Sequence, residues 1–163
     1  MEEIIAGAPG EDNPARKIKD AGSVVTYRVG NPLELARQYG NTPKARLGTK
    51  VASGDINGDS HDDIIASAPR EKSSSGTGRK LPRAGSVSIW NGSDFSPMGS
   101  TMYGDQRKGL FGSALSACDV DRDGMSDLII GSAGYEVSPV APGTKPIRNA
   151  GLVTVFSGAE LSP

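Results

Sequence analysis

Three short blocks of sequence recur in the same order along this chain, and this repetition limits the possible folds more than any other feature. Successive copies of each block are 60 to 66 residues apart. A fixed period of this length is typical of repeat architectures, in which each unit is one small group of secondary structure elements. The first block occupies residues 3–9, 63–69 and 127–133, the second 21–27, 84–90 and 150–156, and the third 47–48 and 111–112.

Each repeat predicts four short strands. The apolar runs are β-branched or alternate with polar residues, and they show no helical period. Glycine is abundant at 22 residues, which favours many turns between short strands. In chain order within a unit, the strands are expected at 49–54 and 113–118, at 64–67 and 128–131, at 86–90 and 152–156, and at 35–39 and 100–103.

Repeated groups of four antiparallel strands describe the blades of a β-propeller. We therefore predict an all-β fold, a partial propeller of about two and a half to three blades, with a β-sandwich as the alternative. Residues 1–46 are expected to form a blade without its first strand, 47–110 a complete blade, and 111–163 a blade without its fourth strand. Propellers typically close with about four to eight blades, so we expect a fragment, a cleavage product or a protomer that completes a ring by assembly.

An acidic loop follows the first strand of two units. In residues 119–127, DVDRDGMSD, carboxylates occupy positions one, three, five and nine, and Gly124 allows the turn that lets them converge. A hard cation such as Ca²⁺ takes about six to eight oxygen ligands, which such a loop can supply. The candidate residues are Asp119, Asp121, Asp123 and Asp127 in this loop, and Asp55, Asn57, Asp59 and Asp63 in residues 55–63.

Other interpretations of these loops are weaker. An EF-hand requires a glutamate at position twelve, where Ala66 and Ile130 stand, and helices where strand-like runs occur. Zinc is not expected, because His61 is the only histidine and lies away from the only cysteine, Cys118. We expect Cys118 to be a small buried residue. A solvated acidic loop that binds no metal is the remaining alternative.

The segments LGTKVASGDINGDSHDDIIASAP and FGSALSACDVDRDGMSDLIIGSA, each followed by AGxV, resemble the FG-GAP repeat of integrin α-subunit propellers and of phosphatidylinositol-glycan phospholipase D. The resemblance implies two structural Ca²⁺ sites, to which the carbonyls of Met125 and His61 are added at position seven. Asn57 replaces an acid of the motif, so the loop at 119–127 is expected to bind Ca²⁺ more tightly. Leu47 replaces the usual Phe, and Ser60 stands where the motif expects glycine.

Composition excludes several functions. No combination of residues predicts a catalytic site, so any catalysis is expected in another domain or chain. The net charge of −1 predicts no nucleic-acid partner, and no apolar run is long enough to span a membrane. Ca²⁺ loops of modest affinity favour an extracellular, secreted or cell-surface location. Asn91-Gly92-Ser93 fits either a glycosylation site or a tight turn.

In the family, ligands bind on the face opposite the metal loops. We therefore expect a protein or glycan ligand at the loops 10–20, 40–46, 70–83, 104–109 and 134–149. The loop 70–83 is basic and could bind an acidic partner such as a sulfated glycan or an acidic protein loop, or simply be solvated. The hypotheses are an adhesion or ligand-binding scaffold, the accessory propeller of a secreted hydrolase, or a protomer of an assembled ring.

Overall fold

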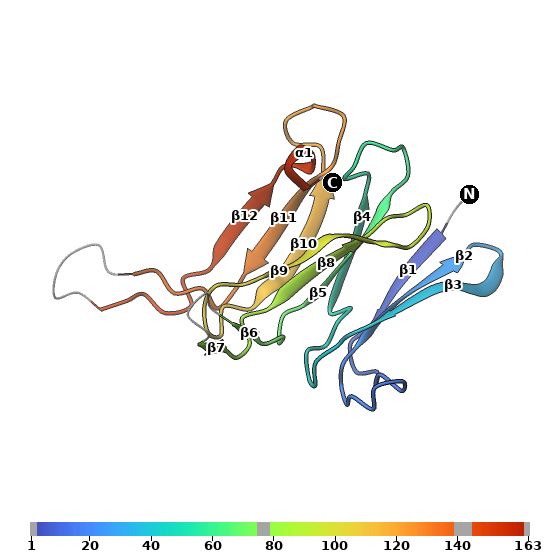
Figure 1. Cartoon of the computed structure of the whole chain (residues 1–163). Coiled ribbons are helices and arrows are strands. Elements are labelled where there is room, and N and C mark those ends of the chain that lie inside the picture. Colours follow the sequence, from blue (N-terminus) through green and yellow to red (C-terminus); the bar gives the residue numbers. More distant parts are fainter. Residues whose placement is uncertain (1–2, 75–78, 139–144, 162–163) are drawn as a thin grey trace.

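In this computed structural model, the described residues 3–74, 79–138 and 145–161 fold almost entirely into strands and loops (Figure 1). The strands pair into three antiparallel sheets of three or four strands, which confirms the all-β fold with propeller-type blades. The first sheet contains β1 (Glu3–Ala8), β2 (Ser23–Arg28) and β3 (Asn31–Tyr39), the second β4 (Lys50–Gly54), β5 (Asp63–Ala68), β8 (Ser86–Trp90) and β9 (Pro97–Tyr103), and the third β10 (Phe111–Cys118), β11 (Asp127–Ser132) and β12 (Leu152–Phe156).

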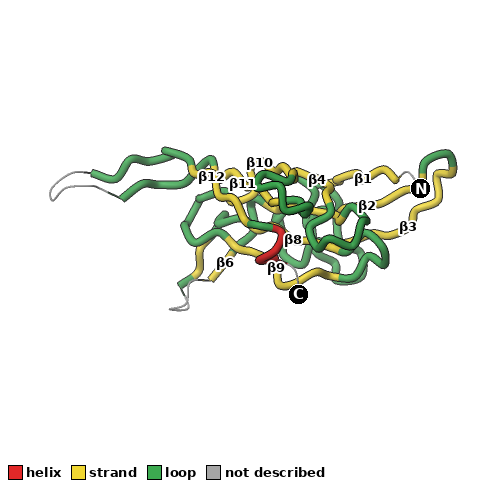
Figure 2. Tube along the Cα trace, turned by 90° about the horizontal axis from the view of Figure 1, so that it is seen from above, coloured by secondary structure: helices red, strands yellow, loops and turns green. Residues whose placement is uncertain are grey.

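The sheets are copies of one pattern. In each, the strands are hydrogen-bonded in chain order, and the pairing of β5 with β8 repeats that of β11 with β12, so Ile64 faces Trp90 as Leu128 faces Phe156. The strands expected at 86–90 and 152–156 have the predicted bounds. Figure 2 shows the sheets following one another along the long dimension of the molecule. The unit boundaries at 46 and 110 stay a prediction.

The middle sheet is covered on both sides. Every residue of β5 is buried, and successive side chains point to opposite faces of a strand. Ile64 packs in a cluster with Val24 of the first sheet, whereas Ile65 packs in a second cluster with Leu128 of the third. The outer strands β1 and β12 have mostly exposed residues. The two hydrophobic cores therefore lie between neighbouring sheets.

Neighbouring sheets are also joined through their backbones. Parallel bridges link Gly22 to Leu47 and Gly85 to Phe111. The N–H of Phe111 donates to the carbonyl of Ala84 at 2.8 Å, and the N–H of Leu47 donates in the same way to the preceding unit. The Ala-Gly that precedes the third strand of one unit therefore holds the residue that starts the next.

Three short elements were not expected from the sequence. Within the expected loop 70–83, β6 (Ser73–Ser74) pairs with β7 (Lys80–Leu81), and residues 75–78 of this loop lie outside the described residues. A four-residue helix, α1 (Gly158–Leu161), follows β12. Residues 139–144 of the loop 134–149 also lie outside the described part.

None of the described helical segments has the length and apolar character that a membrane crossing requires.

Candidate metal centre

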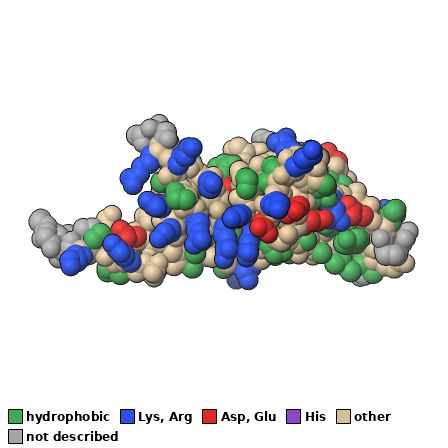
Figure 3. All heavy atoms as spheres, turned by 90° about the horizontal axis from the view of Figure 1, so that it is seen from below, with side chains coloured by type: hydrophobic (Ala, Val, Ile, Leu, Met, Phe, Trp, Pro, Cys, Tyr) green, Lys and Arg blue, Asp and Glu red, His purple; other side chains and the backbone are tan. Residues whose placement is uncertain are grey.

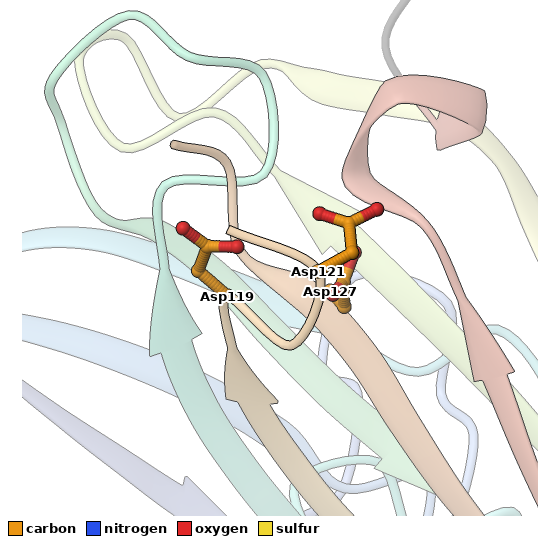
Figure 4. A group of neighbouring side chains, drawn as sticks. All are labelled: Asp119, Asp121 and Asp127. Atoms are coloured by element: carbon orange, nitrogen blue, oxygen red, sulfur yellow. The ribbon is translucent and has the colours of Figure 1, made fainter. Parts of the chain in front are cut away.

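The loop between β10 and β11 brings three carboxylates together. One oxygen from each of Asp119, Asp121 and Asp127 lies within 4.8 Å of the others (Figure 4). Asp119 and Asp121 are exposed, whereas Asp127, the first residue of β11, is buried. Asp123 is not a member of this group. Oxygen ligands at such separations fit a hard cation of the Ca²⁺ type.

The backbone of this loop folds around its carboxylates. Asp119 accepts hydrogen bonds from the N–H groups of Arg122 (2.6 Å) and Gly124 (3.1 Å). Asp121 accepts from the N–H of Asp123, and Asp123 accepts from the N–H of Met125. Gly124 has a φ of 91°, a left-handed conformation that glycine adopts without a steric penalty. The loop therefore turns tightly with its acidic residues already oriented.

Asp127 has a second task in the same loop. Its Oδ2 accepts a hydrogen bond from the N–H of Val120 (2.8 Å), and its Oδ1 accepts one from the N–H of Gly158 (3.2 Å). The first bond closes the loop on itself, and the second reaches a segment that lies 31 residues further along the chain. The buried carboxylate therefore ties the acidic loop to the segment that follows β12.

The loop between β4 and β5 repeats each of these backbone hydrogen bonds at the equivalent position and adds one, from the N–H of Asp59 to Asp55. Asp55 accepts from three backbone N–H groups, Asn57 from that of Asp59, and Asp59 from that of His61. Asp63 accepts from the N–H groups of Ile56 and Gly92, both at 3.0 Å, as Asp127 does from their counterparts. The two loops therefore share one backbone conformation.

The first loop differs from the second in the side chains around Asp59. Its Oδ2 accepts hydrogen bonds from the side-chain amides of Asn57 (3.0 Å) and Asn91 (3.1 Å). The hydrogen bond from Asn57, followed by that from the backbone of His61, lowers the pKa of the Asp59 carboxyl. Burial raises the pKa of the Asp63 carboxyl, and the hydrogen bonds from the N–H groups of Gly92 and Ile56 oppose this rise. Among the described residues, the acids of this loop do not gather as Asp119, Asp121 and Asp127 do.

Three residues near the loops refine the sequence expectations. The ring of His61 is exposed, with Nδ1 3.1 Å from the carbonyl oxygen of Asp59. Asn91 accepts hydrogen bonds from the N–H and hydroxyl of Ser93, so Asn91-Gly92-Ser93 forms a turn. Cys118 is exposed, and the prediction of a buried cysteine was wrong. Burial alternates along β10, and Cys118 falls in step with the exposed Ala114 and Ser116.

The sequence expectations missed the partners of the position-nine carboxylates. Gly92 and Gly158 each stand two residues after the last residue of β8 or β12. The repeat already contained this signal, because Trp90-Asn91-Gly92 and Phe156-Ser157-Gly158 occupy equivalent places. A hydrogen bond between residues about thirty apart requires the fold to bring them together.

The fold and loops define propeller blades with an acidic loop between the first two strands, and sequence comparison agrees. The FG-GAP repeat matches residues 47–90 and 111–156, more than half of the chain, which therefore belongs to this family. The resemblance stated above is confirmed.

Two kinds of protein are similar to this chain. Phosphatidylinositol-glycan-specific phospholipase D of Rattus norvegicus is 32% identical over 130 residues, which cover 74% of this chain and 14% of that protein. Integrin alpha-V of Gallus gallus is 36% identical over 86 residues, which cover 53% of this chain and 7% of that protein. Integrin alpha-8 of Gallus gallus is 31% identical over the same length, with the same coverage. The chain spans only a small part of each relative.

Proposed function

We propose that this chain is a Ca²⁺-binding segment of an FG-GAP propeller that serves as a scaffold for adhesion or ligand binding, with Ca²⁺ in a structural role. The observation that carries this proposal is the group of three carboxylates within 4.8 Å on the loop between β10 and β11. The proposed ligands are Asp119, Asp121, Asp123, Asp127 and the carbonyl of Met125 at one site, and Asp55, Asn57, Asp59, Asp63 and the carbonyl of His61 at the other.

A structural role follows from the electrostatics of the loop. Like charges repel one another, and Asp119, Asp121 and Asp127 converge within a loop of nine residues. A bound cation offsets this repulsion with its own positive charge. Since Asp127 also holds the segment after β12, an ordered loop stabilises the blade as a whole.

Ca²⁺ is expected to stabilise the protein against heat. With free Ca²⁺ about a hundred times above its dissociation constant, one site contributes about 2.7 kcal/mol to the free energy of unfolding. The measurement is a thermal melt followed by circular dichroism, in Ca²⁺ and in chelator. Mg²⁺ at the same concentration is the control and should give a smaller shift, because it prefers octahedral sites and retains its waters. An identical melting temperature in Ca²⁺ and chelator would refute the proposal.

The first loop should bind more weakly, and Asn57→Asp should strengthen it. The substitution adds a carboxylate and removes the amide that donates to Asp59. We expect the affinity of this site for Ca²⁺ to rise about tenfold, because affinity in such loops follows the number of charged ligands. Isothermal titration calorimetry in an Asp121→Asn background, which weakens the other loop, isolates this site. An unchanged affinity would show that Asn57 lies outside the ligand set.

The ligand of the scaffold is proposed to bind at the loops opposite the metal sites. We place the protein outside the cell, secreted or at its surface, where Ca²⁺ is abundant enough for loops of modest affinity. No catalytic role is proposed for this chain.

A second candidate is the propeller part of a secreted hydrolase. It is favoured by one observation, since the similarity to the phospholipase covers 74% of the chain and that to integrin alpha-V covers 53%. Mass spectrometry of the native polypeptide separates the candidates, because a hydrolase domain in the same polypeptide supports the second. A protomer that completes a ring by assembly is a further possibility, and a monomeric molar mass in solution would contradict it.

A further inference from the structure

The basic residues of this chain are concentrated in five loops. Residues 10–20, 40–46, 70–83, 104–109 and 134–149 contain fourteen of the eighteen Lys and Arg residues but only six acids, a net charge of +8 in a chain whose total is −1. All fourteen are exposed. We call the surface that they form the basic loop face. Its cations are Arg16, Lys17, Lys19, Lys44, Arg46, Arg70, Lys72, Arg79, Lys80, Arg83, Arg107, Lys108, Lys145 and Arg148.

The five loops lie at one end of the three sheets. In an antiparallel sheet, the loop after the second strand and the loop before the first strand meet at the same edge. Backbone hydrogen bonds join these loops within a unit, from Lys44 to Lys19 and from Lys108 to Pro82, and between two units, from Gly134 to Gly109. Seen from below, Lys and Arg side chains gather over the middle of this end (Figure 3). The positive charges therefore share one continuous surface, at the opposite end of the sheets from the acidic loops.

Some acids of these loops are turned toward the fold. Glu11 accepts hydrogen bonds from Arg37 of β3 and from the hydroxyl of Ser23. Glu71 accepts from the hydroxyls of Thr42 and Ser86. These carboxylates hold the loops on the sheets, and Arg37, which lies outside the five loops, offsets the charge of Glu11. The basic loop face keeps a strong positive field.

Several cations occupy strained backbone positions. Lys44 and Lys108 stand at equivalent places in two units and both have a φ of 62°, and Arg46 and Arg83 have φ values of 64° and 55°. Glycine adopts this left-handed conformation without strain, whereas an L side chain is penalised there. The fold itself imposes this backbone conformation, since Leu110 and Asn149 adopt it at the places equivalent to Arg46 and Arg83. Glycine can therefore replace Lys44 and Lys108 without disturbing their loops.

A groove crosses this face between the middle and third units. Its volume is about 640 Å³, and its charged lining residues are Arg79, Asp105, Arg107, Lys108, Glu136 and Arg148. Cationic side chains can bind sulfate groups, and carboxylates can accept hydrogen bonds from sugar hydroxyls. No aromatic side chain lines it within the described part of the chain, whereas proteins that bind single-stranded nucleic acid usually stack bases on aromatic rings. A concave groove also fits a linear chain better than a planar membrane.

We propose that the basic loop face binds a linear sulfated glycan, with the groove between the middle and third units as its central subsite. The choice of a glycan over other polyanions rests on the extracellular location in the proposed function. The charge of the face itself does not depend on Ca²⁺.

The test uses heparin oligosaccharides as the probe, with the double variant Lys44→Gly/Lys108→Gly. Glycine fits the left-handed backbone at both positions, so this variant removes two charges while relieving strain. The control is Arg28→Ser/Ala159→Glu, which changes the net charge equally at exposed positions near the metal-loop end. At about 0.15 M salt, the glycine variant should bind heparin about tenfold more weakly than wild type, and the control should bind as wild type does.

The comparison with other probes decides the ligand class. Hyaluronan, which lacks sulfate, should bind much more weakly than heparin. Tighter binding to a short DNA duplex or to phosphatidylserine vesicles than to heparin would overturn the proposal, as would equal losses in both double variants. Repeating the measurement in chelator separates it from the Ca²⁺ proposal. Binding that persists in chelator supports the basic loop face, whereas binding that needs Ca²⁺ and is abolished by Asp121→Asn would assign heparin to the acidic loops.

Discussion

Replacing Asp127 with alanine is expected to lower the free energy of unfolding by about 3 kcal/mol, even with all Ca²⁺ chelated. The substitution leaves the N–H groups of Val120 and Gly158 without the carboxylate that accepts from both. Gly158 is buried, and a buried donor left without an acceptor costs about 1 to 3 kcal/mol, whereas Val120 is an exposed residue whose N–H can bond to water. Urea unfolding in chelator, followed by circular dichroism, measures the loss.

The neighbouring acids provide the control. Asp121 is exposed and accepts a hydrogen bond from the N–H of Asp123 within its own loop, so Asp121→Asn should leave stability in chelator unchanged or slightly raised. Asp63→Ala should reproduce the loss, because Asp63 accepts from Ile56 and Gly92 in the same way. If Asp127→Ala destabilised the protein only when Ca²⁺ was present, its effect would come from metal binding and not from these hydrogen bonds.

Gly85→Ala is expected to lower the free energy of unfolding by about 4 kcal/mol. This loss should exceed that of the same substitution at the equivalent Gly151. A Cβ atom on Gly85 would lie 2.1 Å from the carbonyl oxygen of Phe111, which belongs to the next unit. Since the parallel bridge between these residues joins two sheets, the clash can be relieved only by moving the sheets apart. The left-handed φ of 91° adds its own penalty.

Gly151→Ala is the matched control. Gly151 is the equivalent residue of the third unit, with a φ of 79°, but its Cβ would meet nothing nearer than 4.0 Å. Only the conformational penalty of about 1 kcal/mol is expected there. The measurement is again urea unfolding of both variants. Equal losses at Gly85 and Gly151 would show that the contact between units contributes little to stability.

The strands could be predicted because the repeat supplied each one at least twice. Ile64 and Leu128 start equivalent apolar runs, and Val87 and Val153 lie in equivalent runs that alternate apolar and polar residues. The prediction of each strand therefore did not depend on a single ambiguous segment. The burial of individual residues was harder. Val87 is buried and Val153 is 66% exposed, because the middle sheet is covered on both sides and the third is not. The burial of a strand residue depends on whether a neighbouring unit packs against its sheet, and the sequence of the strand itself does not reveal this.

The sequence predicted which loops could bind a metal ion, but it did not predict the contacts of their carboxylates. The spacing of the carboxylates identified both loops, and the structure brings Asp119, Asp121 and Asp127 together. The hydrogen bond that Asp59 receives from Asn91 could not be foreseen, because Asn91 lies 32 residues further along the chain. The net charge of −1 likewise concealed the separation of acidic and basic loops, which requires the topology.

The loops at the two ends of the sheets differ in how strictly their length is fixed. Both acidic loops have nine residues, whereas the connections from β1 to β2, β5 to β8 and β11 to β12 lengthen from 14 to 17 to 19. A carboxylate at position nine must reach back to position two, so one inserted residue would break the register. The connections at the other end already differ in length between units, so that end tolerates new lengths. Such a blade can therefore acquire new binding specificities by exchanging whole loops, as an antibody does, while its strands and its acidic loop stay unchanged.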